Sequence, residues 1–154
     1  MRDVTALGRA LRGAIAGAGA TAIMSIVMMA SERVGLMGRH PPERIAEHGL
    51  EASDEAPDER AVKAVGAVAH FAFGTAGGAA FGVIAGARDP GTAQRLAVPW
   101  AIAIWLVSYF GWIPAMHVLP PPSEDRPGRA WTMLVAHLVY GASLGTLWRW
   151  ISPR

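Results

Sequence analysis

The sequence of 154 residues lacks cysteine altogether and is poor in charge. Without cysteine the chain forms no disulfide and offers no thiolate ligand for a metal or a redox centre. Only 17% of its residues are charged, whereas a soluble domain carries about a quarter. The net charge of +2 is not gathered into a basic stripe, so we expect no nucleic-acid partner.

Signatures of catalysis are missing as well. The sequence contains no nucleophile elbow, phosphate-binding loop or zinc-protease motif. Its glycine-rich stretch, residues 74–86, follows no predicted strand, so it is typical of helix packing rather than of a dinucleotide site. We therefore expect that the protein is not an enzyme.

Charged residues are absent from four long stretches, which cover residues 13–31, 64–87, 96–123 and 130–148. Since a spanning helix needs roughly 20 mostly apolar residues, the sequence predicts an all-α membrane protein with four transmembrane helices, a single domain over residues 1–154. These helices are expected at about residues 12–31, 61–87, 96–116 and 130–151. The third contains Pro99 and Pro114 near its ends, where proline bends or terminates a helix.

The polar loop 32–60 separates the first two transmembrane helices and is expected to contain a short helix of its own. Pro41, Pro42 and an acidic residue after them suit the first turn of a helix. Ile45 and Ala46 would give this helix a weak apolar edge that lies on the membrane surface.

A sequence repeat links the two halves of the chain. The segment VAHFAFGTAGG, which starts at Val68, returns 67 positions later as VAHLVYGASLG. A histidine, an aromatic residue and two glycines recur in both copies, as His70, Phe73, Gly74 and Gly78 and as His137, Tyr140, Gly141 and Gly145. A weaker match relates Met37, Pro41 and Pro42 to Met116, Pro120 and Pro121. We interpret the chain as two tandem helical hairpins that form a parallel repeat, because each unit holds an even number of helices.

The spacing of the repeated residues predicts how they are placed on their helices. In each copy the histidine and the two glycines are four residues apart and share one helix face. Gly13 and Gly17 form a similar small-residue seam in the first helix, and such seams let membrane helices approach closely. If the second and fourth helices pack along their glycines, His70 and His137 meet at equal depth in the membrane.

Several roles are open for this histidine pair, and both the ligand and any cofactor are unknown. The imidazoles could bind or transport a proton or a metal ion, with Glu32 or His117 as further contributors. Alternatively, each imidazole only fixes helix register by a hydrogen bond. In that case the protein is a structural or accessory subunit of a larger membrane complex. The chain could also form a homo-oligomer. A haem held by the two histidines is a less favoured reading. Glu32 has an interfacial alternative too, in which it pairs with Arg33 or Arg39.

Four segments carry a likeness to a known group of proteins: GAIAGAGATAIMS, GLMGRHPPE, AMHVLPPP and VAHLVYG. With them the chain resembles small bacterial inner-membrane proteins of the YagU-like type. The resemblance implies a four-helix inner-membrane protein without an established enzymatic activity, and it carries over no functional residue. The basic N-terminal segment with Arg2, Arg9 and Arg12 predicts that both termini are cytoplasmic.

Overall fold

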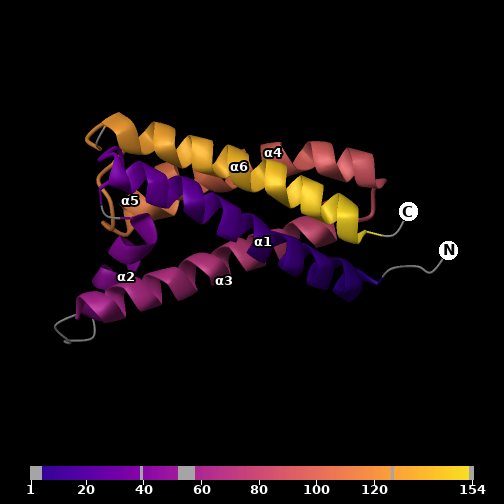
Figure 1. The fold of residues 1–154 in the computed structure, drawn as a ribbon, viewed down its shortest axis with the longest axis horizontal. Coiled ribbons are helices and arrows are strands. Elements are labelled where there is room, and N and C mark those ends of the chain that lie inside the picture. Colours follow the sequence, from indigo (N-terminus) through magenta and orange to yellow (C-terminus); the bar gives the residue numbers. More distant parts are fainter. Residues whose placement is uncertain (1–4, 39, 52–57, 126, 153–154) are drawn as a thin grey trace.

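The computed structural model describes residues 5–38, 40–51, 58–125 and 127–152, and each secondary-structure element in them is a helix. Figure 1 shows these helices as a long bundle with both chain termini at one end. In chain order they are α1 (Ala6–Arg33), α2 (Pro41–Glu51), α3 (Glu59–Ala85), α4 (Pro90–Val107), the π-helix η1 (Ser108–Trp112), α5 (Ile113–Ala115) and α6 (Pro127–Ile151).

Four segments of the bundle are long enough and apolar enough to cross a membrane, which confirms the predicted all-helical fold with four spans. They are Ala6–Arg33, Glu59–Ala85, Pro90–Ala115 and Gly128–Ile151. Two of them begin about six residues earlier than the charge-free stretches indicate, because a polar side chain caps each start. Thr5 accepts a hydrogen bond from the Gly8 amide at 3.2 Å, and Asp89 accepts one from the Thr92 amide at 2.9 Å.

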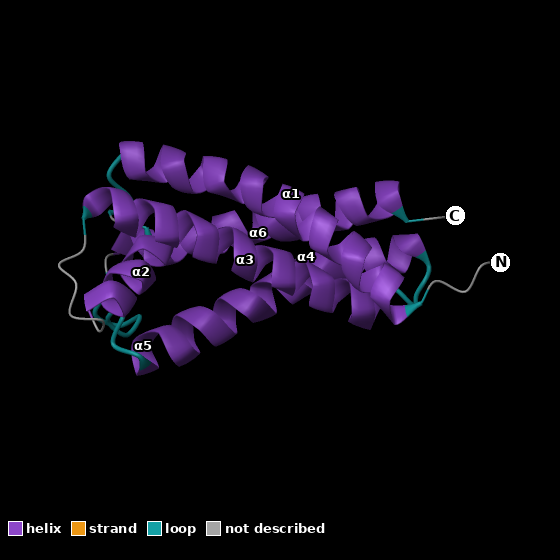
Figure 2. Cartoon of the chain, turned by 90° about the horizontal axis from the view of Figure 1, so that it is seen from below, coloured by secondary structure: helices purple, strands orange, loops and turns teal. Residues whose placement is uncertain are grey.

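The short helix that begins at Pro41 is confirmed and is partly buried against α3, while its expected place on the membrane surface stays a prediction. Pro41 and Ala46 of α2 are buried, and the helix packs against α3. The α2 backbone at Glu43 lies so close to Gly66 that a Cβ there would come within 3.0 Å of it. Figure 2 shows α2 at the end of the bundle opposite the two termini.

The two prolines of the third span behave differently from each other. Pro99 was expected near a helix end, yet α4 begins at Pro90 and continues through Pro99. Pro114 follows the π-helix η1, and the helix ends one residue later at Ala115. Because proline has no N–H to donate to the carbonyl four residues before it, a wider helical turn ahead of Pro114 is a typical adjustment.

The four long helices pack in the order α3, α1, α6 and α4. Contacts are extensive between α1 and α3, between α1 and α6, and between α4 and α6, whereas α3 and α4 make few contacts. Two antiparallel hairpins, α1–α3 and α4–α6, are therefore joined mainly through α1 and α6. Figure 1 shows how α3 diverges from α6 toward the end that carries α2.

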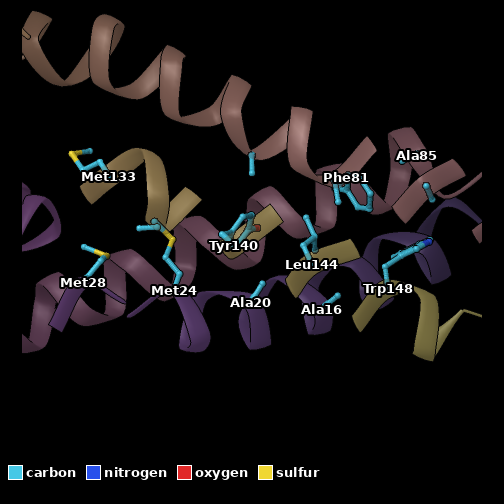
Figure 3. Close-up of a cluster of buried hydrophobic side chains, with 14 of the residues drawn as sticks. Ala16, Ala20, Met24, Met28, Phe81, Ala85, Met133, Tyr140, Leu144 and Trp148 are labelled. Carbon is cyan, nitrogen blue, oxygen red and sulfur yellow. The ribbon is translucent and has the colours of Figure 1, made fainter. Parts of the chain in front are cut away.

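Alanines and methionines, together with a few larger side chains, fill the contact between α1 and α6. Figure 3 shows them as a band in which Ala16 and Ala20 lie near Leu144 and Tyr140, with methionines at one end and Trp148 at the other. Ala20 and Leu144 are fully buried. Close packing through alanine suits helices in a membrane, where lipid supplies no hydrophobic drive for helices to associate.

Candidate functional site

His70 and His137 border the same cavity inside the bundle. The cavity has a volume of about 270 Å³ and lies in the half that carries α2. It is lined by Thr21, Met24, Met28, Met37, Pro41, Pro42, Ile45, Ala69, His70, Phe73, Gly74, Ile104, Ser108, Trp112, Ile113, Met133, Ala136, His137 and Tyr140. Most of these side chains are apolar, so the few polar groups among them stand out as candidate ligand contacts.

The two imidazoles differ in their hydrogen bonds. Nδ1 of His137 lies 2.7 Å from the carbonyl oxygen of Met133, one turn earlier on α6. Since that contact requires a proton on Nδ1, Nε2 of a neutral His137 is an acceptor. Nε2 of His70 is buried and has no hydrogen-bond partner among the residues that the structure describes.

Three hydroxyl groups complete the polar lining of the cavity. Thr21 donates to the Gly17 carbonyl at 2.7 Å, and Tyr140 donates to the Gly74 carbonyl at 2.7 Å. Ser108, in the π-helix, accepts a hydrogen bond from the Trp112 indole at 3.1 Å. Since a hydroxyl oxygen has two lone pairs, Thr21 and Tyr140 donate their protons to the backbone and keep oxygen acceptors for a ligand.

Glu32 and His117, expected as contributors to the histidine pair, lie elsewhere. Neither of them lines the cavity. Glu32 is half exposed at the end of α1 and accepts a hydrogen bond from Nε2 of His40 at 2.7 Å. The expected partner Arg33 is not the one found, because the turn after α1 brings His40 back over Glu32, and Arg39 lies outside the described residues. His117 borders a second pocket.

The glycine seams do not pack the second span on the fourth, which corrects the expected packing. Gly74 and Gly78 of α3 face α1, where Gly78 lies directly against the backbone of Gly13 and Gly17. Gly141 and Gly145 of α6 face α4, against Ala97 and Gln94 among other residues. Each seam thus packs the two long helices of its own hairpin against each other. Both imidazoles nevertheless border the same cavity.

A buried ion pair beside the cavity was not predicted. Arg129 on α6 binds Asp125 at 2.6 Å, and its Nε donates to the Met37 carbonyl at 3.2 Å, so the pair ties the second hairpin to the chain after α1. The π-helix turns Tyr109 inward, and its hydroxyl donates to Asp125 at 2.9 Å. The only signal in the sequence is an acid and a base four residues apart at the start of the fourth span.

For the hypothesis that His70 and His137 bind a metal ion, the described part of the fold supplies no further ligands. Among the described residues, no group of three or more histidine, cysteine, aspartate or glutamate side chains is placed to hold a metal ion. The cavity brings together two imidazoles and three hydroxyls, and hydroxyls are poor ligands for the transition metals that imidazole favours.

Together these features define a multi-pass, all-helical membrane protein with a histidine-bordered cavity inside its bundle. Residues 7–154 match the model of a family of unknown function (DUF6789), and the chain belongs to this family. No curated protein and no solved structure matches the chain. The resemblance to YagU-like proteins has no counterpart among these findings and stays a prediction.

Proposed function

We propose that this protein binds a small, mainly apolar molecule with one hydrogen-bonding group in the cavity between its membrane-spanning helices. The observation that carries the proposal is the buried Nε2 of His70, which has no hydrogen-bond partner in the described part of the chain and borders a mainly apolar cavity. Buried polar atoms are nearly always hydrogen-bonded, and a bound ligand would supply the missing partner. The proposal includes no catalytic step.

The polar groups of the cavity define the ligand's chemistry. Nε2 of His137 and the hydroxyl oxygens of Thr21 and Tyr140 accept, while His70 can present a donor or an acceptor. A hydroxyl or an amine on an apolar body can donate to these acceptors, whereas a carbonyl can only accept from His70. The volume of about 270 Å³ lies just below the range of roughly 300–1,000 Å³ for drug-sized ligands, which favours a small molecule and does not fit haem.

The sparse contact between α3 and α4 offers such a molecule a route from the lipid. Phe73 of α3 and Trp112 of η1 both line the cavity, and their ring centroids are 6.1 Å apart. An apolar ligand dissolved in the bilayer would enter between these two aromatic side chains.

A titration with 1-naphthol, two fused rings with one hydroxyl, tests the proposal on the full chain in detergent. Binding is followed by the fluorescence of the tryptophans, one of which lines the cavity. The native chain should bind saturably. Ala69→Leu, which fills the cavity, should abolish binding, whereas Ala72→Leu on the exposed face of the same helix should not.

Replacing His70 measures how much its imidazole contributes to the affinity for 1-naphthol. His70→Leu should weaken 1-naphthol binding by about tenfold, the size of one hydrogen bond. If the native chain and Ala69→Leu take up equal amounts of probe, partition into the micelle explains the signal and the proposal fails. Co-purification with a large membrane complex would then favour the alternative role as an accessory subunit.

Proton binding is a second candidate, supported by the two imidazoles at one cavity. Histidine is the side chain whose charge changes most readily near neutral pH. Proteoliposomes with an internal pH-sensitive dye separate the two candidates. Proton flux that disappears in the His70→Leu and His137→Leu variants would favour this second function over ligand binding.

We also propose that the protein lies in a bacterial inner membrane with both termini in the cytoplasm. The basic N-terminal segment supports this orientation. Since the chain contains no native cysteine, Ala6→Cys and Ser123→Cys can be labelled singly in intact cells with an impermeant maleimide. Labelling of position 123 alone is expected, and labelling of position 6 alone would reverse the orientation.

The tandem repeat belongs to the same proposal and has structural support. In both copies the two motif glycines face the preceding helix of their own hairpin. Gly38 and His117, which follow the matched Met37 and Met116, both have a positive φ, 69° and 58°. Two matched positions with the same rare backbone conformation are consistent with duplication of one helical hairpin.

A further inference from the structure

A second pocket lies at the end of the bundle that carries α2, where the third span ends and the fourth begins. Its volume is about 320 Å³. It is lined by Arg44, Pro114, His117, Val118, Leu119, Pro120, Pro121 and Arg129. Basic side chains thus reach it from α2, from the turn after α5 and from α6, and no acidic side chain is among the described residues that line it.

Both arginines are held in place by acids outside the pocket lining. Arg129 is almost fully buried and is fixed by Asp125 at 2.6 Å and by the Met37 carbonyl at 3.2 Å. Arg44, on the surface of α2, makes a looser pair with Glu47 at 3.3 Å. A guanidinium group has five N–H donors, so an arginine that is oriented by one acid can still donate to a second anion.

His117 occupies this pocket at a conformational cost. Its φ of 58° lies in the left-handed region, where side chains with a Cβ are strained. The matched position in the first half of the chain is Gly38, which adopts the same conformation freely. Strained residues persist mainly where their side chains have a task, and here the strain keeps an imidazole on the wall of a basic pocket.

We propose that Arg44, His117 and Arg129 bind a phosphate group at the membrane surface. Arginine forks match phosphate oxygens, and basic pockets at the ends of membrane helices recognise lipid headgroups. The pocket lies where the span Pro90–Ala115 ends and the span Gly128–Ile151 begins, and the ends of spans are where we expect lipid headgroups. The source of the phosphate is therefore an anionic phospholipid or free inorganic phosphate. This site is separate from the intramembrane cavity and does not depend on its ligand.

Native mass spectrometry of the full chain, released from nanodiscs, distinguishes the sources. One set of nanodiscs contains phosphatidylcholine alone and a second adds phosphatidylglycerol. A third, of phosphatidylcholine, receives inorganic phosphate. We expect one phosphatidylglycerol molecule to stay bound. Retention of inorganic phosphate in place of the lipid would support the site with a free anion as its ligand.

Two variants avoid the buried Arg129 and so keep the fold intact. Arg44→Gln removes one charge from the surface of α2. His117→Gly removes the imidazole and relieves the strain, so it should leave the melting temperature unchanged or higher. Together they should weaken phosphate binding by about tenfold or more. Arg95→Gln, an exposed arginine at the other end of the bundle that contacts Thr92, is the matched control.

Two outcomes would overturn the proposal. In the first, the Arg44→Gln/His117→Gly variant retains phosphatidylglycerol and inorganic phosphate as well as the native chain does. In the second, Arg95→Gln loses as much binding as the double variant, which would point to general surface charge. Since neither pocket variant touches the cavity with His70, a failure here leaves the binding of 1-naphthol unaffected.

Discussion

The hydroxyl of Tyr140 on α6 donates a hydrogen bond to the carbonyl oxygen of Gly74 on α3, at 2.7 Å. The two residues come from the two copies of the sequence repeat, and the bond joins hairpins that are otherwise held together mainly by α1 and α6. Gly74 is pressed against Thr21 of α1 on another side. Three membrane-spanning helices therefore meet at one glycine, at the inner wall of the cavity.

Tyr140→Phe removes this inter-helix bond and keeps the ring. We expect a loss of about 0.6–1.7 kcal/mol in the free energy of unfolding, the range for hydrogen bonds between membrane helices. Equilibrium unfolding in mixed micelles measures it. Thr146→Val is the control, because the Thr146 hydroxyl donates to the Ala142 carbonyl of its own helix. Equal stability of Tyr140→Phe and the native chain would show that the bond carries no net energy.

Gly17→Ala should push α1 away from α3. A Cβ at this position would lie 2.6 Å from the Gly74 carbonyl oxygen and 2.9 Å from the Gly78 Cα. Because both neighbours are backbone atoms, no side-chain rotation relieves the clash, and overpacking costs about 1–3 kcal/mol. The same substitution at Gly111, where an added Cβ would meet no described atom beyond its own helical turn within 4 Å, should be neutral or slightly stabilising. The melting temperatures of the two variants are compared by thermal unfolding. Similar values would contradict the close approach of α1 to α3 at Gly17.

Asp125→Asn should be the most destabilising of the changes considered. It leaves the guanidinium of Arg129 buried without its counter-charge, although the new amide can still accept from Tyr109. Removing one partner of a buried ion pair costs about 3–5 kcal/mol. The double variant Asp125→Leu/Arg129→Met should recover most of this loss, since an apolar pair of similar size is often neutral. A double variant as unstable as Asp125→Asn would mean that the ion pair is needed for more than charge compensation.

Asp89 links the stability of α4 to pH. The Thr92 hydroxyl and amide hold the pKa of this exposed carboxyl below its usual 3.8. A lowered pKa in the folded state means that the stabilisation is complete above 3.8 and is lost as the pH falls through the folded-state value. The effect is small because solvent screens the carboxyl. Asp89→Asn keeps the cap but cannot titrate, so its melting temperature should depend less on pH in this range. If the melting temperatures of Asp89→Asn and the native chain depended on pH in the same way, the stabilising role of the charged Asp89 carboxylate would be contradicted.

Much of the fold could be predicted because the bilayer constrains it so strongly. Charged residues are excluded from its interior and helices satisfy their own backbone groups, so the charge-free stretches predicted four spans. The helix at Pro41 also followed from local rules, since proline and acidic residues favour a first turn. Helix ends were less accurate, because caps such as Thr5 and Asp89 lie outside the apolar stretches.

The sequence by itself thus determined an all-helical membrane protein, its hairpin order and the faces on which its small residues lie. Only the tertiary structure decided which helix each face meets, because small-residue spacing specifies a face and lipid gives no preference among partners. In the structure, the seam of Gly78 packs against α1 rather than α6, and His70 Nε2 lies at a mainly apolar cavity. The tertiary structure also brings Arg129 to the carbonyl of Met37, a contact that depends on long-range packing rather than on any local pattern.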